Sequence, residues 1–155
     1  MFIRKKKLKS NEYAYLVKNS YNKRKKQSRQ TAKKYLGRVI KIESSKDKTS
    51  ASSMKESIIN ELLKNNFKLS KNRLIKEDIV VDLENISVNE NCKEICLELN
   101  NGFLCKYTLS NLLNFDTHNL NQKELIQKLA ESLVLAGVNL DNESFVKIFN
   151  SINKV

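Results

Sequence analysis

The entire positive excess of this chain lies in its first 43 residues. Residues 1–43 contain 15 lysines and arginines but only two acids, Glu12 and Glu43, which gives a net charge of +13. Residues 44–155 contain 14 lysines and arginines and 15 acids, so their net charge is −1. A short segment that repels itself this strongly needs an anionic counter-surface, whereas the nearly neutral remainder can fold as an ordinary domain.

A serine-rich stretch, "SSKDKTSASS", stands at this charge break and spans residues 44–53. Ala51 is its one aliphatic residue, and such a composition is typical of a flexible linker. A chain of 155 residues is long enough for one domain or two small ones. We therefore predict a basic β-domain over residues 1–43, a linker over residues 44–53 and a near-neutral α+β domain over residues 54–155.

The basic segment predicts strands, because aromatic and β-branched residues alternate in it with polar ones. Tyr13, Tyr15 and Val17 share one face of its central stretch. Gly37 allows a bend or a bulge near the end of the segment. We expect a small three-stranded antiparallel sheet, with a very basic turn over residues 20–27. Its strands cover residues 2–6, 12–19 and 28–36.

Capping signals predict helices in the second part of the chain. Ser53 and Glu56 fit a capping box that opens a helix. A longer helix is expected over residues 121–137, with Asn121 as its N-cap and Gly137 as its stop. Its apolar stripe consists of Leu125, Ile126, Leu129, Leu133 and Val134. Further helical segments are expected over residues 109–115 and 141–152, and one or two short strands over residues 78–88.

A β-hairpin is expected over residues 94–109, and two registers are considered for it. A two-residue turn at Asn101 and Gly102 divides the apolar side chains between both faces. A three-residue loop over residues 100–102, with Gly102 left-handed, gathers them on one face. Burial of a large apolar side chain is worth about 1.5–3 kcal/mol, so we predict the second register. The residues that it places on the buried face are Ile95, Leu97, Leu99, Phe103, Cys105 and Tyr107.

The chain has three cysteines, an odd number, and a single histidine, His118. A zinc site with four ligands would need all of them, and their spacing fits no finger pattern. We therefore expect Cys92, Cys96 and Cys105 to be free thiols in a reducing cytoplasm. The predicted hairpin also places Cys96 and Cys105 on opposite faces, which argues against a disulfide between them.

Catalytic signatures are sparse. With three glycines the chain has no glycine-rich phosphate loop, and no nucleophile accompanies His118. Asp78, Asp82 and Glu84 could form an acidic cluster of the type that holds Mg²⁺, although the solvated edge of an alternating strand gives the same pattern. We expect a protein that is not an enzyme and needs no cofactor or metal. A small metal-dependent nuclease using these three acids is an alternative.

The basic segment is the candidate nucleic-acid interface. Lysine and arginine neutralise phosphates and release counterions, and aromatic rings beside them either stack on bases or support the sheet. We expect Tyr13, Tyr15 and Tyr35 to serve mainly as the core of the small sheet. The cations expected to contact phosphates are Arg4, Lys5, Lys6, Lys7, Lys23, Arg24, Lys25, Lys26, Arg29, Lys33, Lys34 and Arg38.

The stretch "NEYAYLVKNSYNKRKKQSRQTAKKYLGRV" resembles the N-terminal segment of DDE-type transposases of the IS4 and IS1634 groups. That segment reads Y-x-Y-L-V, a basic turn, R-Q and then Y-L-G. The matching positions are Tyr13, Tyr15, Leu16, Val17, Arg29, Gln30, Tyr35, Leu36 and Gly37. In that family the segment precedes the catalytic domain and helps to hold DNA, so the resemblance implies nucleic-acid binding. It covers residues 1–40 only. The chain has no room for the catalytic domain and no assignable DDE triad, so transposition is not expected.

These observations predict a cytoplasmic protein whose basic sheet clamps the phosphate backbone of DNA or RNA. The neutral domain then positions the sheet, through a protein partner or as a homodimer. A ribosome-associated or structured-RNA-binding protein is the alternative, because a basic extension on a neutral domain suits it equally well. No apolar run is long enough to span a bilayer, and no apolar region follows the basic N-terminus, so neither a membrane partner nor a signal peptide is expected.

Overall fold

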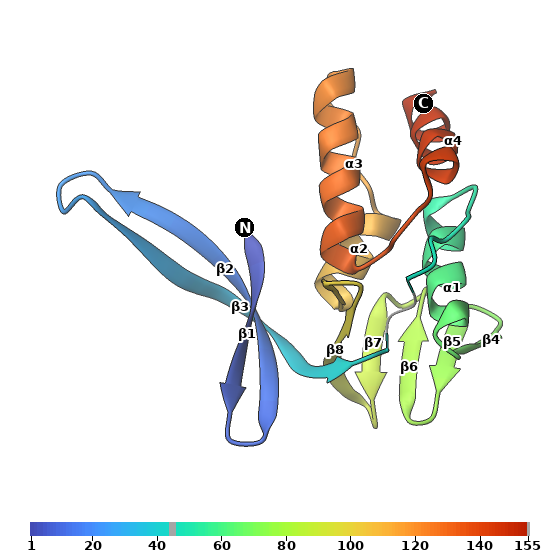
Figure 1. The fold of residues 1–155 in the computed structure, drawn as a ribbon, viewed down its shortest axis with the longest axis horizontal. Coiled ribbons are helices and arrows are strands. Elements are labelled where there is room, and N and C mark those ends of the chain that lie inside the picture. The colour runs from blue at the N-terminus through green and yellow to red at the C-terminus, as the bar shows by residue number, and fades with distance from the viewer. Residues whose placement is uncertain (44–45, 155) are drawn as a thin grey trace.

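The computed structural model describes residues 1–43 and 46–154, which form an α+β fold of four helices and nine strands (Figure 1). This confirms the predicted fold class. The strands are β1 (Phe2–Leu8), β2 (Asn11–Asn22), β3 (Gln27–Lys41), β4 (Lys68–Ser70), β5 (Arg73–Lys76), β6 (Ile79–Asp82), β7 (Ser87–Glu90), β8 (Lys93–Leu99) and β9 (Gly102–Leu104). The helices are α1 (Met54–Lys64), α2 (Lys106–Leu113), α3 (Gln122–Ala136) and α4 (Asn142–Asn153).

The strands join into one sheet of order β1-β2-β3-β8-β7-β6-β5-β4, and β9 pairs with β8. Neighbouring strands are antiparallel except for β3 and β8, which are parallel. β3 therefore belongs both to the N-terminal strands and to the rest of the molecule. In Figure 1 the helices gather over β5–β8, while the hairpin of β2 and β3 extends away from them. We call residues 46–154 the body.

The core of the body lies between its helices and its strands. Leu62 of α1, Val81 of β6, Leu109 of α2, Leu129 of α3 and Ile148 of α4 are all fully buried in one cluster. Burial of each such side chain contributes about 1.5–3 kcal/mol, so this cluster is the main source of stability. None of the helices in the described part of the chain combines the length and apolar character that a membrane crossing requires.

β3 enters the body at a glycine. Residues 38–41 pair with residues 95–98 of β8 in a parallel ladder. Gly37, just before this ladder, has a φ of 128°, which L side chains rarely adopt. A Cβ at this position would lie 2.9 Å from the carbonyl oxygen of Glu94. The irregularity predicted at Gly37 therefore has two causes, a positive φ and the close approach of the body.

A second apolar cluster fastens the N-terminal strands to the body. Ala14, Leu16 and Leu36 pack there against Cys96 of β8 and against Cys105. The predicted placement of Cys96 and Cys105 on opposite faces is therefore wrong, although both are free thiols, as is the exposed Cys92. The neighbouring Cys96 thiol, helped by hydrogen bonds at the start of α2, lowers the pKa of Cys105 against the opposing effect of burial.

The predicted flexible linker is wrong for the residues that the structure describes in it. Thr49 and Ala51 are buried. The Thr49 N–H donates to the Asn139 carbonyl at 2.7 Å, and the Asp141 N–H donates to the Thr49 carbonyl at 3.1 Å. The described part of this polar stretch is packed against the rest of the body, because its buried residues form hydrogen bonds with residues there. Ser44 and Ser45 lie outside the described residues, and the division into separately folding domains stays a prediction.

The hairpin at Gly102 adopts neither of the two registers considered. Leu99 lies opposite Gly102, so the turn consists of Asn100 and Asn101. Their φ angles of 49° and 64° suit a two-residue hairpin turn, and asparagine tolerates this conformation. Gly102 is required for another reason, since a Cβ on it would lie 2.3 Å from the backbone nitrogen of Gly137.

The second strand of this hairpin is also shorter than expected. β9 ends at Leu104, and Cys105 becomes the N-cap of α2. Cys105 and Tyr107 therefore do not lie in a strand, and the helix expected over residues 109–115 begins three residues earlier. The Cys105 N–H donates to the Thr108 hydroxyl at 3.0 Å, which gives the helix a local start that the strand pattern conceals.

The other helices begin near their predicted positions. Asn121 and Gly137 delimit α3, and Asp141 caps α4. The predicted stripe of α3 is only partly right, because Ile126 and Val134 are exposed. At α1 the capping box is half formed. The Ser53 hydroxyl accepts from the Glu56 N–H, but the Glu56 carboxylate accepts from Ser52. β4 and β5 were not expected from the sequence.

Candidate nucleic-acid interface

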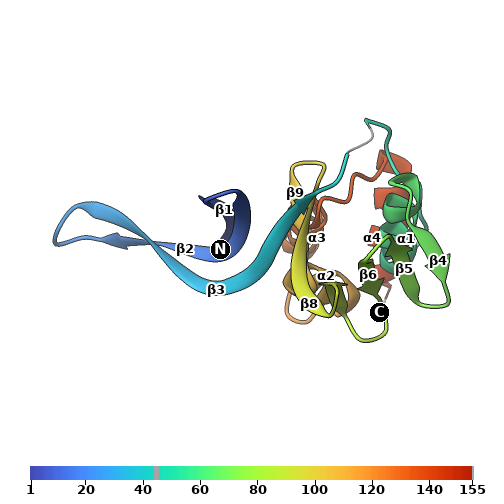
Figure 2. The ribbon, with the colours of Figure 1, turned by 90° about the horizontal axis from the view of Figure 1, so that it is seen from below.

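The hairpin of β2 and β3 continues beyond the small sheet as a two-stranded ribbon. β1 pairs with β2 only over residues 11–17, whereas the β2–β3 ladder runs on to Asn22 opposite Gln27. All residues from 18 to 35 are exposed. Figures 1 and 2 show this part projecting from the molecule. We call residues 18–35 the basic ribbon.

A polar side chain shapes the turn at the tip of the ribbon. The Asn22 carboxamide oxygen accepts hydrogen bonds from the N–H groups of Arg24 and Lys25, at 3.0 and 3.3 Å. Asparagine commonly closes turns in this way. Lys26 then returns the chain with a φ of 46°. The turn covers residues 23–26, so it begins three residues later and ends one residue earlier than the sequence predicts, and residues 20–22 prolong β2.

Two bulges bend β3 where the ribbon meets the small sheet. Tyr35 lies opposite Tyr15 but Gly37 opposite Ala14, so Leu36 is an extra residue. Lys33 is extra in the same way, between the partners of Leu16 and Val17. A bulge increases the local twist of a strand. The curved course of β3 in Figure 2 agrees with this.

The charge of the basic ribbon is uncompensated. Its 18 residues hold eight lysines and arginines and no acid. None of the eight forms an ion pair with any part of the chain that the structure describes. Seven were predicted to contact phosphate, namely Lys23, Arg24, Lys25, Lys26, Arg29, Lys33 and Lys34. Lys18 is the eighth; sequence reasoning missed it, although the alternation continues through it.

The two faces of the ribbon differ, because residues directly opposite each other point to the same side. One face carries the pairs Lys18–Thr31 and Ser20–Arg29, and Lys34 lies on the same face beyond the bulge at Lys33. We call this the cationic face. The opposite face carries Asn19–Gln30 and Tyr21–Ser28, and we call it the neutral face. The cationic face therefore attracts an anion more strongly than the neutral face does.

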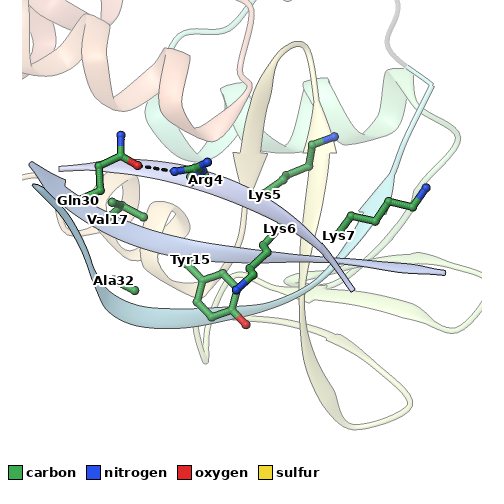
Figure 3. Close-up of a pocket in the computed structure, with 8 residues that line it drawn as sticks. All are labelled: Arg4, Lys5, Lys6, Lys7, Tyr15, Val17, Gln30 and Ala32. Carbon is green, nitrogen blue, oxygen red and sulfur yellow. Dashed lines mark hydrogen bonds between the residues drawn. The ribbon is translucent and has the colours of Figure 1, made fainter. Parts of the chain in front are cut away.

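A groove of about 630 Å³ lies between β1 and the base of the ribbon (Figure 3). Its lining consists of Arg4, Lys5, Lys6, Lys7, Tyr15, Val17, Gln30 and Ala32. The Arg4 guanidinium donates to the Gln30 side-chain oxygen, which ties β1 to the ribbon. Lys5 and Lys7 point to the other side of β1 from Lys6 in Figure 3. The groove thus offers Lys6 and Arg4 as its inward cations.

The three tyrosines are not the core of the small sheet, which corrects the sequence prediction. Tyr35 is 53% exposed. Its ring centroid lies 5.4 Å from that of Tyr15 and 6.2 Å from that of Tyr13. Partial burial among these rings raises the pKa of Tyr35. The core role belongs instead to Ala14 and Leu16 on the other face, so the tyrosines form a ring cluster facing solvent.

Two predicted phosphate contacts are engaged within the protein. Lys5 lies 3.0 Å from Glu98 and 3.3 Å from Glu12, and Glu98 above all raises the pKa of this lysine. Arg38 is paired with Glu90. Neither charge stands free for a phosphate, so Lys5 and Arg38 anchor the small sheet to the body instead. These ion pairs could not be predicted from residue spacing in the sequence, because the fold brings the acids to their partners.

One of the three acids of the alternative nuclease site, Asp82, has structural partners. Asp82 is buried, lies 3.1 Å from Arg73, and accepts hydrogen bonds from the N–H groups of Glu84 and Asn85. The Asn85 hydrogen bonds lower the pKa of Asp82. The carboxylate therefore closes the turn after β6. Within residues 1–43 and 46–154, no three His, Cys, Asp or Glu side chains are grouped to hold a metal ion.

Comparison of the chain with protein-family models, with curated protein sequences and with solved structures finds no match. The resemblance of residues 1–40 to the transposase segment therefore stays a prediction.

Proposed function

We propose that this protein binds nucleic acid through the basic ribbon and acts without catalysing a reaction. The observation that carries the proposal is a set of eight exposed cations on a projecting ribbon that contains no acid, none of them in an ion pair with a described residue. Such a surface neutralises phosphates and releases condensed counterions, which is the main source of affinity that does not depend on sequence. The resemblance to a DNA-holding segment implies the same function.

The body has a positioning role in this proposal. β3 runs from the ribbon into the sheet of the body, and the cluster around Leu16 and Cys96 fastens its base. Fastening the base restricts the directions in which the ribbon can project, which lowers the entropy lost on binding. We propose the cytoplasm as the setting, which the three free cysteines suit. A partner or a second copy of the chain would dock on the body.

The test is a binding titration of the full chain with a fluorescent short DNA duplex. In one variant, Lys23, Arg24, Lys25 and Lys26 are changed to glutamine. In the matched control, four exposed lysines of the body, Lys68, Lys93, Lys123 and Lys154, are changed in the same way. Both lose four positive charges. We expect the ribbon variant to lose about a hundredfold in affinity at moderate salt and the control less than about threefold.

Equal losses in the two variants would show that net charge rather than the ribbon attracts the duplex. Failure of the unmodified chain to bind DNA or RNA at low salt would remove the proposal, and the ribbon would then more reasonably face an acidic protein.

A further inference from the structure

We propose that the basic ribbon enters the major groove of duplex DNA with its cationic face toward the bases, where Arg29 contacts guanine. This inference rests on the proposed function and specifies its ligand. It separates duplex DNA from RNA and from single strands, and it assigns different tasks to the two faces of one hairpin.

The shape of the ribbon favours the major groove. Beyond Val17 only β2 and β3 remain paired, and no third strand covers them in the described structure. Two strands lie about 4.8 Å apart, and such a ribbon fits a groove about 12 Å wide. The minor groove of B-form DNA, about 6 Å wide, is too narrow without distortion. The major groove of A-form RNA is deep and narrow, so side chains do not reach its bases.

The length of the ribbon is also suitable. Five cross-strand pairs, from Lys18–Thr31 to Asn22–Gln27, precede the turn. At about 3.4 Å for each residue they extend roughly 17 Å. The ribbon therefore reaches into a groove while the tip lysines and Lys33 remain free to contact the flanking phosphates.

Single-stranded nucleic acid fits the ribbon less well. Proteins that hold single strands without sequence preference use successive aromatic rings as stacking platforms. Between residues 18 and 34, Tyr21 is the one aromatic residue in the sequence. The ring cluster of Tyr13, Tyr15 and Tyr35 lies at the base and leaves the projecting part without such a platform.

The donors on the cationic face match guanine. Lys18, Ser20, Arg29 and Thr31 form two adjacent cross-strand pairs on this side. The Ser20 hydroxyl donates to the Arg29 carbonyl at 3.3 Å, while the Arg29 guanidinium has no hydrogen-bond partner among the described residues. Guanine presents two acceptors, O6 and N7, in the major groove, and arginine binds both at once. The pairs of the neutral face contain no cation, and the cations on that side, Arg4 and Lys6, stand at the groove by the base of the ribbon. Along the projecting part, attraction to DNA therefore turns the cationic face inward.

The first experiment measures affinity of the full chain for four probes of one base sequence. They are duplex DNA, duplex RNA, duplex DNA in which each cytosine carries a glucosylated 5-hydroxymethyl group, and duplex DNA with netropsin in its A·T tracts. The sugar fills the major groove, and netropsin fills the minor groove. We expect losses of about tenfold or more with duplex RNA and with the glucosylated DNA, and less than about threefold with netropsin.

The second experiment selects binding sites from a pool of random DNA duplexes. Arg29→Lys keeps the charge but removes the planar fork, so we expect loss of a guanine preference, worth about tenfold, with an unchanged salt dependence. Asn19→Ala on the neutral face is the control, and we expect it to retain the preference. Both residues are exposed, so circular dichroism should show intact folding in each variant.

Each result decides between the two proposals. Equal binding of duplex DNA and RNA, or insensitivity to the glucosyl groups, would overturn groove entry while nucleic-acid binding stands. Loss of sequence preference in Asn19→Ala but not in Arg29→Lys would reverse the orientation and overturn the assigned face. Absence of binding to every probe would overturn both proposals.

Discussion

The basic ribbon and the body both contain β-strands, but most strands of the body contribute buried side chains and those of the ribbon are exposed. In the body, strands such as β6 and β8 hide their apolar side chains, and Val81 and Leu97 are fully buried. In the ribbon no residue from 18 to 35 is buried, and the two strands are held mainly by their backbone ladder. The body thus gains its stability from packing, while the ribbon depends on the anchorage of its base.

This difference separates stability from the proposed binding. The cations of the ribbon are exposed and pair with no acid in residues 1–43 and 46–154, so their replacement removes few interactions that stabilise the fold. Core residues of the body, in turn, lie away from the exposed ribbon. Mutations should therefore fall into two classes, and a mutation that affects both properties would argue against the separation.

The largest expected effect comes from shortening the ribbon. Replacing residues 20–29 by Asn-Gly joins Asn19 to Gln30 through a two-residue turn and removes five cations. We expect about a thousandfold loss of affinity for duplex DNA at low salt, with a melting temperature close to that of the unmodified chain. Calorimetry and a binding titration measure the two quantities. A large fall in melting temperature would show that the ribbon supports the body.

A core substitution should give the converse result. Leu62→Ala removes a fully buried side chain of α1 and should lower the free energy of unfolding by about 2–5 kcal/mol. Tyr21→Ala in the exposed ribbon is the control and should change it by less than about 0.5 kcal/mol. Urea denaturation measures both. The folded fraction of Leu62→Ala should bind DNA with unchanged affinity, and weaker binding would connect the two regions.

The salt dependence distinguishes free cations from paired ones. With about six phosphate contacts, the logarithm of the affinity should fall against the logarithm of salt concentration with a slope near −5. Lys25→Gln in the turn should reduce the magnitude of this slope by about 0.9. Lys5→Gln should leave it unchanged, because Glu12 and Glu98 already engage that charge. A flat salt dependence between 50 and 200 mM would exclude phosphate contacts altogether.

The ring cluster at the base of the ribbon should respond only weakly. Tyr35→Phe keeps the contacts with Tyr13 and Tyr15 and should have almost no effect on stability. Tyr35→Ala should cost about 1 kcal/mol, because aromatic pairs contribute about 0.5–1.5 kcal/mol and this ring is half exposed. Unfolding of the small sheet in Tyr35→Ala would restore the core role that the structure contradicts.

The smallest expected effect is a pH dependence confined to the body. Hydrogen bonds from the Ser50 hydroxyl and the Ser144 N–H lower the pKa of Asp141 to about 2. The stabilisation is therefore complete above the unfolded pKa of about 3.9 and is lost as the pH falls toward 2. Asp141→Asn should keep the cap of α4 but show a flatter stability profile between these pH values. An unchanged profile would assign that dependence to other carboxylates.

Elements with strong local signals could be predicted from the sequence. The helix α3 was fixed by Asn121 and Gly137, since a capping side chain and a left-handed stop act within a few residues. The strands of the basic segment followed from alternation. The end of β9 could not be predicted, because Cys105 and Tyr107 continue a strand-like pattern while the hydroxyl of Thr108 starts a helix.

Long-range contacts explain the remaining errors. Gly102 appeared to serve the turn, but its contact with Gly137 requires the folded position of α3. Tyr35 was predicted to be a core residue because its ring is large and partly apolar. The bulges that determine which face it lies on cannot be predicted from the sequence. The cationic character of the candidate interface was predictable from composition. The pairing of Lys5 with Glu98 was not, because these residues are 93 positions apart in the sequence.

The pleat of the basic ribbon also imposes a parity rule on its length. Two residues added to each strand would carry the turn about 7 Å farther and leave the existing pairs on their faces. One residue added to each strand, beside Asn19 and Gln30, would move Ser20 and Arg29 to the other side. The hairpin can therefore lengthen by an even number of residues per strand without changing its faces. An odd number would move the cations of its outer part to the opposite face, while the body stays the same.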